Sequence, residues 1–325
     1  MSETTKILTI VEPDSHPQEV VRRATWLAGL YDCEIELLWC DPTISPLGES
    51  LFLGNEASEI KDRIRAAQNE ILDDLAAIAR DAGVAVSVSI LDKRPIADGI
   101  LDTTIEMRPR FVVKGVEYHS VAERSILVDT DWQLLRNCVY PLWLVKPHEM
   151  HENLRIVASV DPTHSHDKPA SLDQVIVDVA KDIANRGSGD VHLLHTYDRL
   201  LGVGNEATFT FKPIILPVEE LDKKIQKEHR DQLDALANTN NIDSKHVHQL
   251  PGKTSDILPA FVRSHGMDLV VMGAIARWGI KRAIIGSTTE RVLDMLPCDV
   301  LIARISHADI DGESLISSGT LPDSD

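Results

Sequence analysis

Aromatic residues are scarce in this chain of 325 residues, in which Phe, Trp and Tyr together make up 4%. Because hydrophobic residues still reach 43%, any core must be built mostly from Val, Ile, Leu and Ala. Basic residues are also few, with 33 Lys and Arg against 51 Asp and Glu, for a net charge of -18. Contacts to nucleic-acid phosphates and to anionic lipids need cationic surface, so this deficit argues against both classes of partner.

Cysteines and long apolar runs are equally scarce. The chain has four cysteines and no Cys-x-x-Cys pair, so we expect no disulfide framework, and a reducing, cytoplasmic setting fits best. No apolar run reaches the roughly 18 residues that a membrane span requires. The amino terminus MSETTKILTI lacks the basic flank and apolar run of a signal peptide.

Apolar segments of strand length alternate with amphipathic helical segments along the chain. In the first half we expect strands at 7–11, 34–39, 85–90, 111–114 and 142–145, and helices at 18–30, 60–82, 96–106 and 131–136. In the second half we expect strands at 155–160, 191–197, 246–250, 269–272 and 300–303, and helices at 172–185, 219–237, 257–265 and 288–296. The segments 41–58 and 200–217 are expected to be loops. Apolar strands that do not alternate, separated by helices, predict buried parallel sheets in an α/β fold.

The second half repeats the first. Without a gap, residues 94–146 overlay residues 252–304, and Gly115 falls on Gly273. We therefore predict a fused duplication, with domains at 1–150 and 151–308 followed by an acidic tail at 309–325 that is expected to be disordered. The last strand of each half has an exposed apolar edge, and such edges invite pairing. We expect the two edges to pair antiparallel, with the halves packed face to face as an intramolecular pseudo-dimer.

A loop with two glycines in the second half carries the strongest chemical signal. Gly273 follows the fourth strand, where we expect it to let the chain turn. Ser287 and Glu290 form an S-x-x-E capping box, which predicts that a helix starts there. Free N–H groups around Thr288 would then form an anion site, and Gly286 would let a phosphate approach the backbone. Because the chain has neither G-x-x-x-x-G-K-[ST] nor G-x-G-x-x-G, the residues alone leave open whether these are ordinary loop and cap glycines.

The run Asp268–Gly273, the spacing G-x-x-A-x9-G-S from Gly273 onward and the following T-T-E-R-V-L resemble the universal stress protein family. Nucleotide-binding members of that family carry G-x-x-G-x9-G-[ST] at this point. They also carry an Asp at the end of the first strand, a place that Asp161 fills here. The resemblance covers the whole chain in two copies. It implies a tandem member with two five-stranded sheets, each in the order 3-2-1-4-5, and a role in stress survival.

The resemblance also implies a site for an adenine nucleotide, ATP or a relative with or without Mg²⁺, in the second half. Asp161 would contact the adenosine end and the backbone around Leu194 the adenine. Ala276 departs from the pattern, because glycine is usual there, and Arg277 beside it is either a phosphate partner or a solvated loop residue. The implied site residues are Asp161, Leu194, Gly273, Ala276, Gly286, Ser287 and Thr288.

The first half lacks the same features. Glu12 stands at the place of Asp161, and Tyr118, Val128 and Asp129 replace the alanine, glycine and serine of the motif. Asp129 can still cap a helix, but we expect its carboxylate to stand where a phosphate would bind. Two such anions repel by about 4 kcal/mol at an effective dielectric near 20. The first half is therefore expected to be structural or to bind another ligand.

Other chemistry is weakly indicated, and we predict no catalytic residues. Among the thirteen histidines, His192 and His195 would lie on opposite faces of one strand, and either could approach His248 on the next. Without metal-ligand spacing, ordinary histidines are favoured over a metal site.

No general base or Mg²⁺-binding acid accompanies the glycine motif of the second half, which favours a regulatory binding protein over a slow ATPase. A structural protein that holds an apolar ligand, a further homodimer and a protein partner all remain open.

Overall fold

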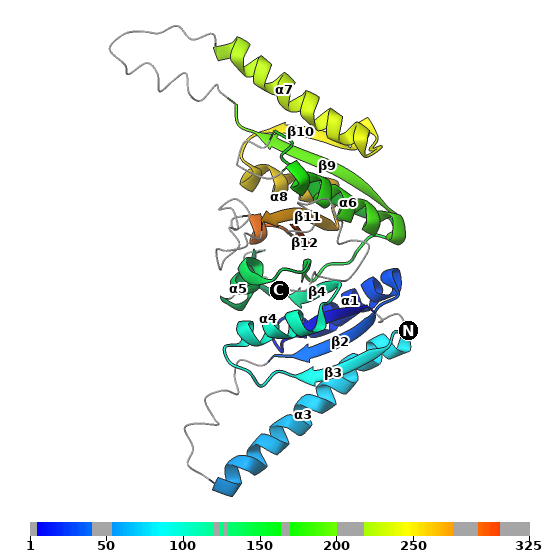
Figure 1. Cartoon of the computed structure of the whole chain (residues 1–325), viewed down its shortest axis with the longest axis vertical. Coiled ribbons are helices and arrows are strands. Elements are labelled where there is room, and N and C mark those ends of the chain that lie inside the picture. Colours follow the sequence, from blue (N-terminus) through cyan, green and yellow to red (C-terminus); the bar gives the residue numbers. More distant parts are fainter. Residues whose placement is uncertain are drawn as a thin grey trace, which may run out of the picture.

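The structure is a computed structural model that describes residues 5–40, 54–119, 124–126, 129–163, 170–199, 218–275 and 292–305. Its main feature is a ten-stranded sheet in the order β10-β9-β8-β11-β12-β7-β4-β1-β2-β3 (Figure 1). No helix within these ranges is long and apolar enough to cross a membrane.

The first half builds one side of the sheet. Its strands are β1 (Lys6–Val11), β2 (Glu34–Trp39), β3 (Val86–Ile90), β4 (Phe111–Gly115) and β7 (Leu142–Val145). Its helices are α1 (Pro17–Tyr31), α3 (Gly54–Asp81), α4 (Ile96–Met107) and α5 (Asp129–Asn137). All neighbouring strands here are parallel, in the order β3-β2-β1-β4-β7, which is the predicted order 3-2-1-4-5.

The second half builds the other side in the same way. Its strands are β8 (Leu154–Ser159), β9 (Gly189–Tyr197), β10 (Val247–Pro251), β11 (Leu269–Ile275) and β12 (Asp299–Ile305). Its helices are α6 (Ala170–Gly187), α7 (Val218–Thr239), the 3-10 turn η4 (Ser244–His246) and α8 (Thr254–His265). The parallel order β10-β9-β8-β11-β12 confirms the predicted order for this half too.

Three local expectations need correction or lie outside the described residues. Helix α3 begins at Gly54, inside the expected loop 41–58, because the polar stretch before Ile60 has no apolar period to reveal a helix. A small hairpin of β5 (Glu117–His119) and β6 (Arg124–Ile126) was not expected, since strands of three residues carry too short a pattern. The loop 200–217 and the tail 309–325 lie outside the described ranges.

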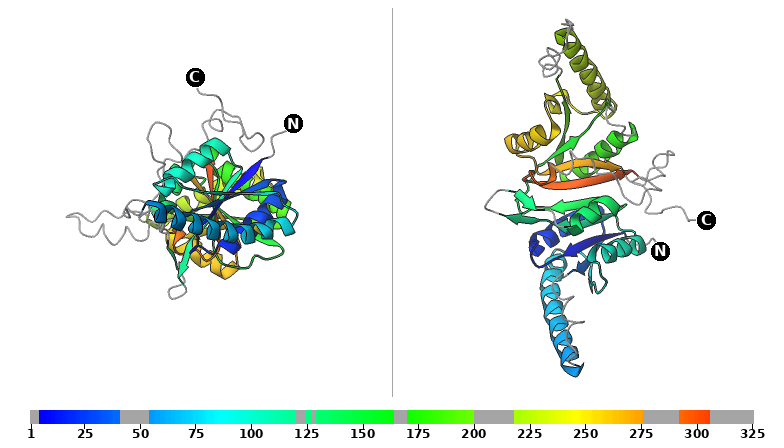
Figure 2. Two further views of the ribbon diagram at one scale, coloured as in Figure 1. Left: turned by 90° about the horizontal axis from the view of Figure 1, so that it is seen from below. Right: turned by 90° about the vertical axis from the view of Figure 1, so that its left-hand side faces the viewer.

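The two halves meet at their last strands. Strand β12 pairs antiparallel with β7, with Leu301 opposite Trp143. These two residues are counterparts in the repeat, so their pairing places a pseudo-twofold axis at this point. The predicted antiparallel pairing is confirmed. Because ladder hydrogen bonds join strand edges, however, the halves lie edge to edge in one sheet rather than face to face (Figure 2).

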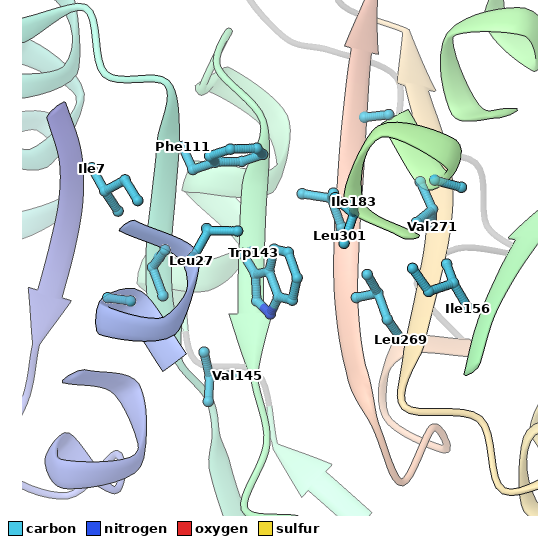
Figure 3. Packing of buried hydrophobic residues seen from close by; sticks show 14 of the residues in the cluster. Ile7, Leu27, Phe111, Trp143, Val145, Ile156, Ile183, Leu269, Val271 and Leu301 are labelled. Atoms are coloured by element: carbon cyan, nitrogen blue, oxygen red, sulfur yellow. The ribbon is translucent and has the colours of Figure 1, made fainter. Parts of the chain in front are cut away.

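Helices cover both faces of this shared sheet. Buried side chains of α1, α3, α6 and α7 pack on one face, and those of α4, α5 and α8 pack on the other. The first cluster continues across the junction, where Trp143 lies between Phe111 of its own half and Leu301 of the other (Figure 3). The halves therefore share one core on this face.

Candidate functional site

The carboxyl ends of β8 and β11 form the most favourable place for a ligand in the second half. The strand order changes direction between these two neighbours, and open α/β sheets bind ligands at such switch points. Asp161 comes two residues after β8 ends, and Gly273 lies near the end of β11. The structure thus brings these two predicted residues to the same edge of the sheet.

Asp161 is held by a hydrogen-bonded turn. Its backbone N–H donates to Oδ1 of Asp173, at the start of α6, over 2.9 Å. The Thr163 hydroxyl donates to Oδ1 of Asp161 over 2.9 Å, and Nδ1 of buried His195 lies 4.0 Å from the same oxygen. These contacts fix the carboxylate at the end of β8 while its side chain stays 14% exposed.

Leu194 lies on the second strand of its half, as expected, whereas Gly273 is placed differently from the sequence expectation. Leu194 is buried within β9, and its carbonyl accepts a hydrogen bond from Val160 N–H over 3.0 Å, so this backbone oxygen is already engaged. Gly273 does not turn the chain, because β11 runs on through Ile275. The absence of a side chain at Gly273 instead makes room for helix α6. A Cβ at Gly273 would lie 2.5 Å from a methyl carbon of Leu172, so glycine lets α6 pack directly over the strand.

The remaining predicted motif lies outside the described residues. This applies to Ala276, Arg277, Gly286, Ser287 and Thr288. The structure describes residues 292–293 as helical, inside the helix that the sequence predicts at 288–296. The roles assigned to the motif remain predictions.

The equivalent place in the first half is filled by the protein's own charges. Lys114, on β4, is 1% exposed, and its ammonium lies 2.6 Å from Oε2 of Glu12 and 2.7 Å from Oδ1 of Asp131. The Ser15 hydroxyl also donates to Glu12 over 3.0 Å. Burial lowers the pKa of Lys114, but Asp131 and Glu12 outweigh that effect and raise it above its ordinary value. We call Glu12, Lys114 and Asp131 the charge cluster.

The charge cluster, rather than Asp129, is the structural reason to expect no phosphate in the first half. Asp129 is exposed and accepts a hydrogen bond from Gln133, one turn further along α5, so its carboxylate is not the buried anion of this half. Helix α5 already begins at Asp129, which makes it a first-turn residue rather than the expected cap. The buried carboxylate is that of Asp131, two residues later.

Sequence reasoning missed Lys114, although a signal was present. A lysine interrupts the apolar strand Phe111–Gly115, and the repeat places it opposite Met272 of the second half. A charge on a buried parallel strand needs a partner, and Glu12 at the end of the neighbouring strand was the obvious candidate.

One expected histidine pair forms across neighbouring strands, and a second pair, which was not predicted, joins a strand to a helix. Nδ1 of His192 lies 3.0 Å from Nε2 of His248, and His195, on the other face, lies 2.7 Å from Nδ1 of His229 on α7. Burial, followed by neighbouring imidazoles, lowers the pKa of His192 to about 4. Within the described part of the chain, no three His, Cys, Asp or Glu side chains are arranged to hold a metal ion.

Comparison with known proteins agrees with the repeat. The model of the universal stress protein family matches residues 3–146 and again residues 156–304. The chain is 24% identical over 305 residues to universal stress protein E of Salmonella typhi, covering 92% of this chain and 93% of that protein. Universal stress protein E of Escherichia coli K12 is 23% identical with the same coverage.

Solved structures share the fold at low identity. A structure described as a universal stress protein of Pseudomonas aeruginosa UCBPP-PA14 is 22% identical with a TM-score of 0.66, covering 93% of this chain and 94% of that one. A universal stress protein of Archaeoglobus fulgidus DSM 4304 is 16% identical with a TM-score of 0.65, covering 93% and 99%. With both halves matched by the family model and most of the chain aligned with two-domain relatives, the chain belongs to the universal stress protein family as a tandem member similar to universal stress protein E.

Proposed function

We propose that this protein binds one adenine nucleotide per chain, ATP or a close relative, in its second half and acts as a binding and regulatory protein in the stress response. The contrast between the two halves carries this proposal. In the first half the switch point holds the charge cluster. In the second half Asp161 replaces Glu12, and the apolar Met272 replaces the buried ammonium of Lys114. The second half therefore lacks that internal cation and keeps the uncharged Gly286-Ser287 motif.

The nucleotide would bridge two groups of residues. Asp161, which is fixed at the end of β8, would accept hydrogen bonds from the ribose or adenine. The N–H groups that follow Gly286 would hold the phosphates at a helix amino terminus, where the helix dipole favours anions. Ala276 adds one methyl group where nucleotide-binding family members carry glycine. The methyl group would leave less room for the nucleotide but would add no charge.

Ser287→Asp tests this assignment. The variant keeps a helix-capping side chain but places a carboxylate beside the phosphates, so we expect ATP affinity to fall about tenfold or more, which corresponds to about 1.4 kcal/mol. Isothermal titration with ATP measures the affinity, and circular dichroism verifies folding.

The matched control is Asp129→Ser at the aligned position of the first half. It should leave both affinity and stoichiometry unchanged, because the charge cluster still fills that half. Unchanged affinity in a folded Ser287→Asp variant would show that the phosphates bind elsewhere.

A further inference from the structure

Four imidazoles gather where β9, β10 and α8 meet. Nδ1 of His192 on β9 lies 3.0 Å from Nε2 of His248 on β10, and the ring of His246, in η4, is centred 4.2 Å from that of His192. The ring of His265, the last residue of α8, is centred 5.7 Å from that of His248. Phe261 of α8 packs against His192, His248 and His265. We call His192, His246, His248 and His265 the histidine cluster.

The geometry of the histidine cluster requires neutral rings. In the bond between His192 and His248 one nitrogen donates a proton and the other accepts it, so the accepting nitrogen cannot itself be protonated. Burial, followed by the other three imidazoles, lowers the pKa of His192 to about 4. Burial, followed by His265 and His246, also lowers the pKa of His248. The closed cluster is therefore uncharged at neutral pH, and any proton that it takes up is unfavourable.

The charged groups around the histidine cluster do not compensate for an added proton. These groups are Arg155 of β8, Asp190 of β9, Arg230 of α7, and the ion pair of Asp243 with Lys245 at η4. Asp190 raises the pKa of His192, but by less than burial and the imidazoles lower it, and its carboxylate already accepts a hydrogen bond from Asn153. Arg230 lowers the pKa of His248 further.

The first half has different chemistry at the same place. The registers of the two sheets put Glu36 of β2 at the position of His192. The Ser87 hydroxyl of β3 donates to the Glu36 carboxylate, and the Lys6 ammonium lies 3.6 Å from it. The edge strand β3 is thus joined to β2 by a carboxylate and a hydroxyl, without an imidazole pair.

Strand β10 lies at the outer edge of the sheet and bonds only to β9 within it (Figure 1). We propose that the histidine cluster is a proton-sensitive latch, which holds β10 on β9 at neutral pH and releases it in mild acid. Because the folded pKa values of His192 and His248 lie below the unfolded value of 6.5, the latch is fully effective above that pH and weakens as pH falls toward the folded values. The latch acts whether or not a nucleotide binds.

Amide hydrogen exchange of the full chain at pH 7.5 and pH 5.5 tests the latch, with each rate divided by the intrinsic rate at that pH. One imidazole that titrates near pH 6.5 only when released would raise the opening equilibrium about tenfold between these values. Solvent screens a partly exposed cluster, so we expect residues 247–251 to lose about threefold to tenfold of their protection. Residues 86–90 of β3 should lose no comparable protection. Carboxylates with ordinary pKa values stay charged over this range.

Variants assign the response to the histidine cluster. In His192→Gln/His248→Gln the side chains can still form a hydrogen bond but do not titrate, so the loss of protection at residues 247–251 should disappear. His16→Asn, at an exposed position of the first half, is the control and should keep the wild-type response. The pair of His195 and His229 on the other face of β9 is intact in every variant. If the double variant does not fold, His192→Gln, which also breaks the bonded pair, replaces it.

A loss of protection that is confined to residues 247–251, kept in His16→Asn and absent from the double variant would support the latch. Equal losses in residues 247–251 and 86–90 would mean that acid destabilises the whole sheet, and would overturn it. Full protection of residues 247–251 at pH 5.5 would overturn it as well. A loss that persists in the double variant would assign the response to other groups, such as the pair of His195 and His229, and would also overturn it.

Discussion

Replacing Asp299 with alanine should destabilise the whole chain by about 3–5 kcal/mol, the cost typical of removing one partner of a buried ion pair. Asp299 is fully buried at the start of β12, and its contacts are with the first half. Oδ2 lies 2.8 Å from Nε of Arg23 and accepts from the Trp143 indole over 2.8 Å, while Oδ1 accepts from Lys146 N–H over 2.9 Å. The variant leaves the buried Arg23 guanidinium without this carboxylate.

Urea denaturation followed by circular dichroism measures this loss. Asp182→Ala is the matched control, because Asp182 also bonds across the junction, to Tyr31, but its side chain is 28% exposed. Its removal should cost about 1 kcal/mol, the usual contribution of the hydrogen bond to Tyr31, because its partly exposed ion pairs with Arg110 and Arg186 add little. A loss below that of the control in Asp299→Ala, or two separate unfolding transitions in the wild type, would show that this carboxylate does not hold the halves together.

Lys114→Met, which copies Met272 of the second half, should cost about 3–5 kcal/mol by the same mechanism. The variant leaves Glu12 and Asp131 facing each other without their shared cation, and Asp131 is buried. Two charged carboxylates left without a cation would then destabilise the folded state. The deficit relative to wild type should therefore shrink as pH falls and these groups take up protons.

The pH dependence of the wild type has a different origin. Because the folded pKa of Lys114 is raised, its contribution is complete below the unfolded value of 10.5 and is lost only as pH rises through the folded value. Urea denaturation of the wild type and of Lys114→Met at pH 7 and pH 5 measures whether the deficit of the variant shrinks at the lower pH.

The triple variant that adds Glu12→Gln and Asp131→Asn to Lys114→Met should recover most of the stability, since no unpaired charge remains. An equal deficit at both pH values would mean that lost packing, not charge, is responsible.

Much of the fold could be predicted from the sequence, because the signals were local. Apolar strands separated by amphipathic helices indicated buried parallel strands, and the gapless overlay of residues 94–146 on 252–304 indicated the duplication. The strand order came from the family resemblance. The exposed edges of the last strands were enough to predict the antiparallel pairing of β7 with β12.

The interactions that distinguish the halves could not be predicted locally. Lys114 finds its partners 102 residues earlier at Glu12 and on the following helix at Asp131, so no window of sequence contains the charge cluster. Asp299 stands at the position that Pro141 occupies in the first half, so the repeat gives no hint of its role. Its carboxylate binds donors of the first half only once the two halves pair. Because Asp129 aligns with Ser287, its carboxylate was predicted to stand where a phosphate would bind, but it is exposed. The helix instead turns Asp131 inward.

The most direct test of nucleotide binding in one half is to count the nucleotides bound to one chain. Native mass spectrometry of the full chain, at an ATP concentration near the wild-type dissociation constant, should show at most one nucleotide per chain, with occupancy retained in Asp129→Ser and strongly reduced in Ser287→Asp. This result would place the ligand in the second half and leave the first half occupied by its charge cluster. Two nucleotides per chain, or unchanged occupancy in Ser287→Asp, would contradict the division of roles between the halves.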